Sequence, residues 1–227
     1  MEDGMVNTTL LAVISWSTYF MLTKKLLPNY SYEFRNRIVS TTHAILAVTL
    51  ASHSVKDWSC PVCPSNTNSN PQQMQALAVT MGYLIYDLVC SQFDKKSNLD
   101  NTIHHLVSII GIVAGISYQK CVSEMIAALF ITEISSPFLH LREFLKELGY
   151  RDTDLNLAAD IMFAVTFSIA RMVLGPFLFF AVLSADNPLL IKAMAAGLQF
   201  VSAYWFYKIL KMVQFKLTKR TRSKKVA

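Results

Sequence analysis

The sequence predicts an all-α membrane protein, a polytopic bundle of transmembrane helices, and three observations support this fold class. Hydrophobic residues make up 53% of the 227-residue chain. Charged residues make up 16%, whereas a soluble domain carries about 25%. Apolar runs of about 18 residues or more, the length that crosses a bilayer, recur along the whole chain. With a mean hydropathy of +0.36, we expect no separate soluble domain.

Turn residues and charges divide the apolar runs into seven predicted helices with short connections. The first run follows the acidic start MEDGMVN, which lacks the positive segment of a cleaved signal peptide, so this helix is expected to be retained. The longest connection, residues 56–73, is rich in Pro, Asn and Ser. Because boundaries taken from sequence shift by a few residues, six to eight spans fit the pattern. The predicted helices are 6–26, 37–55, 74–91, 102–118, 122–144, 157–184 and 188–212.

Lys and Arg flank these helices in order and predict their orientation. Seventeen lie after the first, third, fifth and seventh helices or at their ends: Lys24, Lys25, Arg35, Arg37, Lys95, Lys96, Arg142, Lys146, Arg151 and the eight from Lys208 onward. The opposite set holds three: Lys56, Lys120 and Lys192. Basic residues mark cytosolic connections. We therefore expect a cytosolic C-terminus and, with seven spans, an N-terminus in the lumen or outside the cell.

The chain divides into three predicted parts. Residues 1–34 form the N-terminal span and a cytosolic linker, residues 35–212 the main transmembrane domain, and residues 213–227 a basic cytosolic tail. The last twelve residues hold six Lys or Arg and no acid. A basic run can bind nucleic acid, but beside a hydrophobic helix it meets anionic lipid at the cytosolic surface. We therefore expect membrane lipids as partners and no nucleic acid.

Two short signals predict a multi-pass protein of the endoplasmic reticulum membrane. Lys224 and Lys225 stand fourth and third from the C-terminus, where they resemble a dilysine retrieval signal that coat machinery reads. The alternative is that they are two more lysines of a basic tail. Asn7-Thr8-Thr9 is a glycosylation sequon on the predicted lumenal end.

The cysteines and histidines predict no metal site and no cofactor. Cys60 and Cys63 form CPVC in the predicted lumenal loop, where an oxidising compartment allows a disulfide that braces the loop. A zinc site needs four ligands, and no second cysteine pair exists. Cys90 and Cys121 are expected to act as small hydrophobic residues. The five histidines are too few and too irregularly spaced for the histidine boxes of di-iron membrane desaturases.

Four predicted spans carry ionisable side chains toward their cytosolic ends. His43 lies about 9 Å and Asp87 about 10 Å inside this boundary at the helical rise per residue. His104 and His105 open the fourth span, and His140 is near the cytosolic end of the fifth. Ionisable groups in hydrocarbon are costly and therefore mark functional sites. The sequence predicts that these groups converge on one polar cluster.

Glu133 and Arg171 are expected deeper, near the middle of the membrane. An isolated carboxylate there would neutralise or find a cation, and Arg171 is the one Arg or Lys placed deep in a predicted span. The sequence therefore predicts that Glu133 and Arg171 pair or share a polar network.

The adjacent residues His104 and His105 cannot both face one point. Successive residues of a helix diverge by about 100°, so at most one of the two rings is expected to face a central site. The other would contact lipid headgroups, loop backbone or a neighbouring helix. The alternative is that both histidines lie at the interface and cap polar loop groups.

Four blocks of the sequence resemble the TLC domain, the family of ceramide synthases and translocation-associated membrane proteins. They are RNRIVSTTHAILAV (Arg35–Val48), MGYLIYDLV (Met81–Val89), IHHLVSIIG (Ile103–Gly111) and FITEISSPFLHLREFL (Phe130–Leu145). The resemblance covers about residues 35–212 and implies a compact helical bundle around a central cavity.

The resemblance also implies roles for particular residues. In ceramide synthases the paired histidines lie in the catalytic cavity and serve transfer of a fatty acyl group from acyl-CoA to an amine, as base or acyl acceptor. By resemblance, His104 and His105 occupy that position, and Glu133 or Asp87 would be the orienting acid, so these four are the candidate catalytic residues. From their places in the predicted spans, a polar binding cluster is assigned to His43, Arg37, His140, Ser135 and Arg171.

The chain departs from ceramide synthases about 28 residues after the histidine pair. Where those enzymes carry roughly HDxSD, this chain has Thr132 to Ser136, so histidine is replaced by Thr132 and the second aspartate by Ser136. SSPF is typical of the branch of TLC domain-containing proteins that are not ceramide synthases. We therefore expect a role in membrane lipid homeostasis, through lipid binding, sensing or trafficking. The alternatives are an acyl-CoA-dependent N-acyltransferase and a translocon-associated chaperone.

Overall fold

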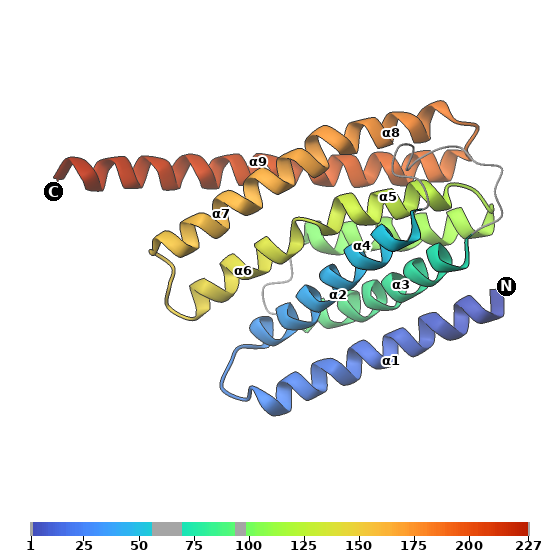
Figure 1. The fold of residues 1–227 in the computed structure, drawn as a ribbon, viewed down its shortest axis with the longest axis horizontal. Helices are drawn as coiled ribbons and strands as arrows, with labels where there is room; N and C mark the ends of the chain where they lie inside the picture. The colour runs from blue at the N-terminus through green and yellow to red at the C-terminus, as the bar shows by residue number, and fades with distance from the viewer. Residues whose placement is uncertain (1, 56–69, 94–98, 227) are drawn as a thin grey trace.

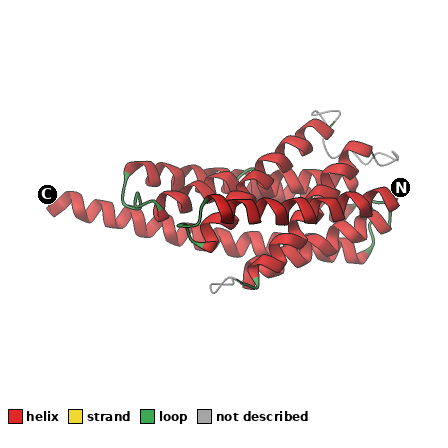
Figure 2. Cartoon of the chain, turned by 90° about the horizontal axis from the view of Figure 1, so that it is seen from below, coloured by secondary structure: helices red, strands yellow, loops and turns green. Residues whose placement is uncertain are grey.

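The computed structural model describes residues 2–55, 70–93 and 99–226, and every regular element in these ranges is helical (Figure 1). The helices run lengthwise through an elongated bundle (Figures 1 and 2). They are α1 (Glu2–Leu26), α2 (Tyr32–Ser54), α3 (Pro71–Ser91), α4 (Leu99–Ser117), α5 (Val122–Glu133), α6 (Ser136–Glu147), α7 (Asp154–Phe167), the π-helix η1 (Ser168–Leu174), α8 (Gly175–Ser184) and α9 (Leu189–Val226). The predicted all-α bundle is confirmed.

Six helical segments within the described ranges are long and apolar enough to cross a membrane. They are Gly4–Leu26, Pro71–Ser91, Leu99–Ser117, Val122–Glu147, Asp154–Ser184 and Leu189–Phe215. The one remaining predicted span, 37–55, corresponds to α2. This helix has 23 residues but carries Glu33, Arg35 and Arg37 in its first half. It packs against α1, α3, α5 and α6 inside the bundle. The number of helical segments thus matches the sequence prediction, and polarity alone sets α2 apart.

The helix α2 begins earlier than its apolar residues predict, because Ser31 caps it. The Ser31 hydroxyl accepts a hydrogen bond of 2.9 Å from the backbone N–H of Phe34, which satisfies one of the free donors of the first turn. The Ser31 backbone N–H and hydroxyl in turn donate to the Glu147 carboxylate over 3.0 and 2.9 Å. The capped start of α2 is therefore tied to the end of α6.

The fifth predicted helix is broken into α5 and α6. Ile134 and Ser135 separate the two, and Pro137 lies in the first turn of α6. Proline lacks a backbone donor and clashes with the carbonyl four residues before it, which explains the interruption after Glu133. The break falls beside the segment in which this sequence departs from ceramide synthases.

The sixth predicted helix contains a π-helical section, η1, before Pro176 in the first turn of α8. Such sections are frequent at functional sites, and this one carries Arg171. The breaks in the fifth and sixth segments lie next to each other, since η1 packs against α5. The packing of two irregular segments brings Arg171 to the end of α5.

One end of the bundle gathers basic connections. The α1–α2 and α6–α7 connections lie at this end, and α9 continues beyond the other helices there (Figure 1). We call it the basic end. The predicted tail is a continuation of α9 as far as Val226. Because the chain reverses direction repeatedly, α4 packs along α9 although a long stretch of sequence separates them.

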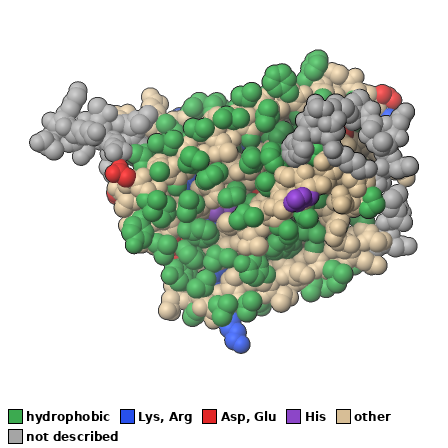
Figure 3. All heavy atoms as spheres, viewed as in Figure 1, with side chains coloured by type: hydrophobic (Ala, Val, Ile, Leu, Met, Phe, Trp, Pro, Cys, Tyr) green, Lys and Arg blue, Asp and Glu red, His purple; other side chains and the backbone are tan. Residues whose placement is uncertain are grey.

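The core of the bundle is small and tightly packed, while the periphery is apolar. Ala44, Ala47 and Ala51 of α2 and Leu77 and Leu84 of α3 are almost fully buried. At Gly82 of α3 a Cβ atom would lie 2.5 Å from Cβ of Ala12, so α1 and α3 approach too closely for a larger residue. Large apolar side chains such as Leu11, Phe177 and Phe200 are exposed, and hydrophobic side chains cover much of the face in Figure 3. An apolar exterior of this kind suits contact with lipid.

Candidate functional site

A cavity of about 150 Å³ lies inside the bundle, between α3, α4, α5, α8 and α9. Most of its lining is apolar, including Leu77, Ile112, Met125, Phe179, Val182 and Leu198. His104, Thr132, Glu133, Arg171 and Ser202 gather toward the basic end, and we call these five residues the polar end of the cavity. Further polar lining residues are Thr80, Ser108, Gln199 and Glu124. The cavity thus combines mostly apolar walls with a few polar side chains, which is the usual character of a small-molecule site.

The opposite end of the cavity is lined by Cys121 and Glu124. The Cys121 thiol donates to the side-chain oxygen of Asn187 over 2.9 Å. Burial raises the pKa of this thiol to about 11, so Cys121 remains a neutral thiol at neutral pH. It therefore behaves as the small, unreactive residue that the sequence predicts.

Arg171 reaches the polar end from η1 and is 5% exposed. Its Nη2 donates to the backbone carbonyl of Thr132 over 2.6 Å, and its Nη1 lies 3.5 Å from the Ser202 hydroxyl. The guanidinium also lies 5.2 Å from the ring centres of Phe167 and Trp205, within the range of cation–π attraction. These contacts hold the guanidinium in one place at the cavity wall.

Glu133 lines the same cavity as Arg171, as the prediction of a shared polar network requires. No ion pair joins the two among the contacts of the described residues; Arg171 binds the carbonyl of Thr132 and the hydroxyl of Ser202 instead. The two charges still attract each other beyond ion-pair distance, and the Ser136 side chain bonds to the Glu133 carboxylate.

His104 also faces the cavity and is 6% exposed. Its ring centre lies 5.0 Å from that of Trp205, and its buried Nδ1 has no hydrogen-bond partner. Trp205 in turn donates from Nε1 to Asp100 over 2.5 Å, and Lys208 reaches the same carboxylate oxygen over 3.1 Å. This pairing of α4 with α9 holds the Trp205 ring against both His104 and Arg171.

His105 faces the other side of α4, toward α2 and α3. Its Nδ1 lies 3.5 Å from Oδ2 of Asp87. The other oxygen of Asp87 accepts a hydrogen bond of 2.7 Å from the Asn36 amide, and the Asn36 carbonyl accepts one of 2.7 Å from the Tyr86 hydroxyl. We call Tyr86, Asn36, Asp87 and His105 the polar chain. Its links fix the orientation of both the carboxylate and the imidazole.

His43 packs beside this polar chain without joining it by a hydrogen bond. Its ring stacks on Tyr83 with centres 3.7 Å apart and planes 6° apart, and Trp16 approaches it edge-on at 5.8 Å. The side chain is 1% exposed, and neither ring nitrogen has a hydrogen-bond partner. The Tyr83 ring centre is 6.5 Å from that of His105. Aromatic packing therefore dominates the surroundings of His43.

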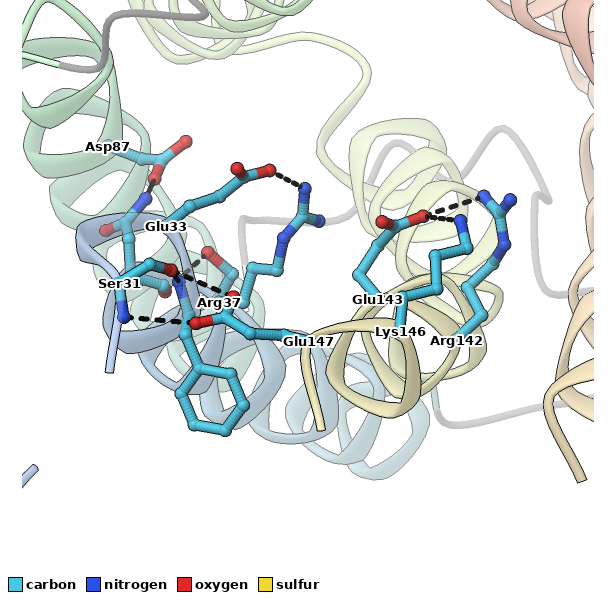
Figure 4. A network of polar contacts seen from close by, with 11 residues as sticks. Ser31, Glu33, Arg37, Asp87, Arg142, Glu143, Lys146 and Glu147 are labelled. Atoms are coloured by element: carbon cyan, nitrogen blue, oxygen red, sulfur yellow. Dashed lines mark hydrogen bonds and ion pairs between the residues drawn. The ribbon is translucent and has the colours of Figure 1, made fainter. Parts of the chain in front are cut away.

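The remaining residues of the predicted binding cluster lie outside the cavity lining. Arg37 pairs with Glu33, one turn earlier on α2, at the basic end (Figure 4). Ser135 is buried in the turn between α5 and α6, where its backbone carbonyl accepts from Leu139 over 3.2 Å. His140 has a buried Nδ1 without a partner. The structure thus places Arg37 in the surface network and Ser135 at a helix break.

The basic end carries a network of charged side chains, shown in Figure 4 with Asp87. Arg142 pairs with Glu143 over 3.2 Å and with the buried Asp160 over 2.5 Å, and Lys146 pairs with Glu143 over 2.6 Å. Together with the bond between Ser31 and Glu147, these contacts tie α2, α6 and α7 together. We assign these contacts a structural role, because the charges are paired with one another within the protein.

The structure therefore places the predicted site residues in two groups on opposite sides of α4. The cavity holds His104, Glu133 and Arg171; the polar chain holds His105 and Asp87. Sequence reasoning missed Asn36, Tyr86 and Trp205. The first two stand inside blocks that resemble the TLC domain, but a search for ionisable side chains passes over uncharged ones. Cys60 and Cys63, and the side chains of Lys224 and Lys225, lie outside what the structure describes.

Comparison with known proteins identifies the family. A model of the TLC domain matches residues 33–211. The chain is 24% identical over 148 residues to the putative TLC domain-containing protein L438 of Acanthamoeba polyphaga mimivirus, covering 62% of this chain and 73% of that protein. It is 28% identical over 161 residues to TLC domain-containing protein 4-B of Danio rerio, covering 67% of this chain and 58% of that protein.

A third relative is TLC domain-containing protein 4 C of Dictyostelium discoideum, 26% identical over 194 residues, which are 79% of this chain and 70% of that protein. All three relatives bear the name of TLC domain-containing proteins rather than of ceramide synthases. The matched residues 33–211 include α2, in which the resemblance begins, and most of α9. This chain therefore belongs to the TLC-domain family.

Proposed function

We propose that this protein acts in membrane lipid homeostasis, by holding a lipid in the cavity of a multi-pass protein of the endoplasmic reticulum membrane. The observation that carries the proposal is the cavity itself, which is apolar along most of its length and polar at the end formed by His104, Glu133 and Arg171. An amphiphile with a polar head and an apolar chain matches this distribution.

The polar end is what would select the lipid. The hydrocarbon of a bilayer is as apolar as the cavity wall, so transfer of an acyl chain from bilayer to cavity supplies little hydrophobic free energy. Binding must then come from close packing in the cavity and from hydrogen bonds to the head. These bonds are stronger in a low-dielectric interior than in water.

A cavity-filling variant tests whether lipid occupies this space. Ala195 lines the cavity on α9, and Ala193 is exposed on the same helix. Ala195→Phe should greatly reduce the lipid that co-purifies with the full chain, while Ala193→Phe should leave it unchanged. Native mass spectrometry of the two variants measures the bound lipid. Equal lipid content in both variants, with normal folding, would show that the cavity is not the lipid site.

A second candidate function is an acyltransferase, for which the polar chain is the specific observation. Asp87 lies beside Nδ1 of His105, an arrangement that can orient an imidazole as general base, and His104 faces the cavity. Against this, Thr132 occupies the place of a ceramide synthase histidine, and its hydroxyl is bonded to the carbonyl of Leu129 over 3.1 Å. Lipid binding therefore explains more of the site.

The double variant His104→Ala/His105→Ala separates the two candidates. For an acyl-CoA-dependent enzyme, the cellular lipid profile should change as it does when the protein is lost, although the variant accumulates normally. A folded double variant that restores a normal lipid profile in cells lacking the protein would exclude the acyltransferase. Variant abundance, measured in the same cells, is the control for folding.

The proposed location and orientation need their own test. Seventeen Lys and Arg on one side of the membrane against three on the other favour a cytosolic C-terminus, and Lys224 and Lys225 would then be open to coat machinery. Replacing both lysines with serine should move the protein beyond the endoplasmic reticulum, as seen by microscopy. A tag at the C-terminus should be digested by protease in intact microsomes. Protection of the tag would overturn the orientation.

A further inference from the structure

We propose that the ligand of the cavity is a single-chain lipid whose head carries an anionic oxygen group, a carboxylate or a phosphate, and that Arg171 binds this group. The inference rests on the proposed function, because it names the class of lipid that the cavity takes. It follows from three observations: the unused donors of Arg171, the contacts that hold its guanidinium at the wall, and the small volume of the cavity.

Several hydrogen-bond donors of the Arg171 guanidinium are not used within the described part of the protein. A guanidinium carries five N–H donors, of which the structure directs one at the Thr132 carbonyl and one at the Ser202 hydroxyl. Nε is buried and has no hydrogen-bond partner. Glu133 attracts the guanidinium, but no carboxylate among the described residues lies within ion-pair distance of it. A buried cation whose charge is only partly compensated is costly, and an anion in the cavity would lower that cost.

The same contacts make Arg171 a preorganised site. The bond to Thr132 and the flanking rings of Phe167 and Trp205 fix the plane of the guanidinium. A fixed guanidinium plane suits the paired oxygens of a carboxylate or phosphate. The carboxylate of Asp100, which lies beyond Trp205, is already bonded to Trp205 and Lys208. It therefore does not compete for Arg171.

The dimensions of the cavity limit the ligand to one chain. Along α9 the lining runs from Ile191 to Ser202, a rise of about 16 Å. A volume of about 150 Å³ along that length leaves little room for a second chain. Away from Arg171 the lining is mostly apolar, with Glu124 at the opposite end, so the head would lie at the polar end and the chain would point toward Ile191.

Glu133 affects the affinity of this site for an anionic head but is not the group that binds the head. Its carboxylate lines the cavity beside Arg171, so an ionised Glu133 repels an anionic head and a protonated one can donate a hydrogen bond to it. Neutral glutamine at this position removes the repulsion. Glu133→Gln should therefore bind an anionic lipid at least as tightly as the unaltered protein.

Three lipids with similar chains test the head group on the purified, delipidated full chain in neutral detergent. They are oleate, oleoyl lysophosphatidate and oleyl alcohol, which carry a carboxylate, a phosphate and no charge. At a hundredfold excess over Kd, at least one of the anionic lipids should raise the Tm by about 5 °C, and oleyl alcohol should raise it far less. The stronger of the two anionic lipids identifies the head as carboxylate or phosphate.

Arg171→Gln should abolish the difference between the anionic lipids and oleyl alcohol. Arg151→Gln is the matched control, because Arg151 is exposed in the α6–α7 connection, and it should preserve the difference. Should Arg171→Gln not fold, Arg171→Lys keeps the charge but loses the planar fork, and it should weaken the response to the anionic lipids. The comparison of the three lipids on the unaltered protein needs no variant.

The outcomes distinguish the inference from the function on which it rests. Equal stabilisation by oleyl alcohol and the anionic lipids overturns recognition by Arg171 but leaves lipid binding intact. Loss of oleate and lysophosphatidate binding in Glu133→Gln also overturns it, because Glu133 would then be the partner of the head. If none of the lipids stabilises the protein and Ala195→Phe changes no co-purified lipid, the proposed lipid site itself is wrong.

Discussion

His104 and His105 are neighbours in the sequence, but their side chains lie in two regions with different physical character. The cavity side, with His104 and Arg171, has empty volume and polar groups with unused hydrogen-bonding capacity. On the packed side, the polar chain runs from Tyr86 through Asn36 to one Asp87 oxygen, and the other oxygen lies 3.5 Å from Nδ1 of His105. The cavity side has room for the lipid proposed above, and the packed side joins three helices.

The difference shows that burial and charge alone do not identify a site in a membrane bundle. Both histidines are about equally buried, at 6% and 5% exposure. They differ in what adjoins them, because His104 lines the cavity and His105 lies beside the Asp87 carboxylate. Variants that alter one side and leave the other intact test this difference.

The largest effect is expected on the packed side. Asp87→Ala leaves the Asn36 amide and the His105 imidazole without their partner in the interior, which should lower the free energy of unfolding by about 3 kcal/mol. Asp186→Ala is the control, since the Asp186 side chain is fully exposed and its loss should have almost no effect. Denaturation in detergent measures both. Equal stability of the two variants would show that the polar chain does not hold the helices together.

A smaller effect should separate the two histidines. His105→Ala leaves the Asp87 carboxylate without one partner and should lower the free energy of unfolding by about 2 kcal/mol. His104→Ala should cost less than about 1 kcal/mol, because the His104 ring adjoins a cavity and forms no ion pair with a carboxylate of the described residues. Its effect should appear in the co-purified lipid instead. Denaturation and mass spectrometry of the same samples measure stability and bound lipid. A larger loss of stability in His104→Ala, with a larger loss of lipid in His105→Ala, would contradict the division into a cavity side and a packed side.

The smallest effect, with the opposite sign, is expected at His43. Phenylalanine preserves the stack on Tyr83 and removes two buried nitrogens that have no partner. His43→Phe should therefore raise the free energy of unfolding by up to about 1 kcal/mol. His53→Phe, at an exposed position of the same helix, should change it little. If His43→Phe instead destabilises the protein or alters bound lipid, His43 has a polar partner or a functional role.

Much of the fold could be predicted from the sequence, because helix formation in a membrane depends on local properties. The length of each apolar run predicts a helix that crosses the bilayer, and all seven predicted helical segments are present. Pro137 and Pro176 are visible in the sequence, yet their consequence is not. Proline can kink, break or merely tilt a helix, and the choice depends on the neighbouring helices that accept the freed backbone groups.

Only part of the candidate site could be predicted from the sequence, because its contacts depend on neighbouring helices. Geometry within one helix requires that His104 and His105 point in different directions, and the structure agrees. The identity of what lies on each side depends on how α4 is rotated against α3 and α9. Uncharged residues such as Asn36 and Trp205 acquire their roles from those contacts, so a search by residue type passes over them.

The sequence by itself determined the class of molecule, the number of helical segments and the family, since these depend on apolar length, charge placement and motifs along the chain. The tertiary structure decided the division of the polar residues into a cavity and a packed chain. It also decided that Arg171 donates to the Thr132 carbonyl, while Glu133 attracts it from beyond ion-pair distance. Such contacts join helices distant in sequence, and packing between helices, unlike the formation of each helix, is not encoded in any local stretch.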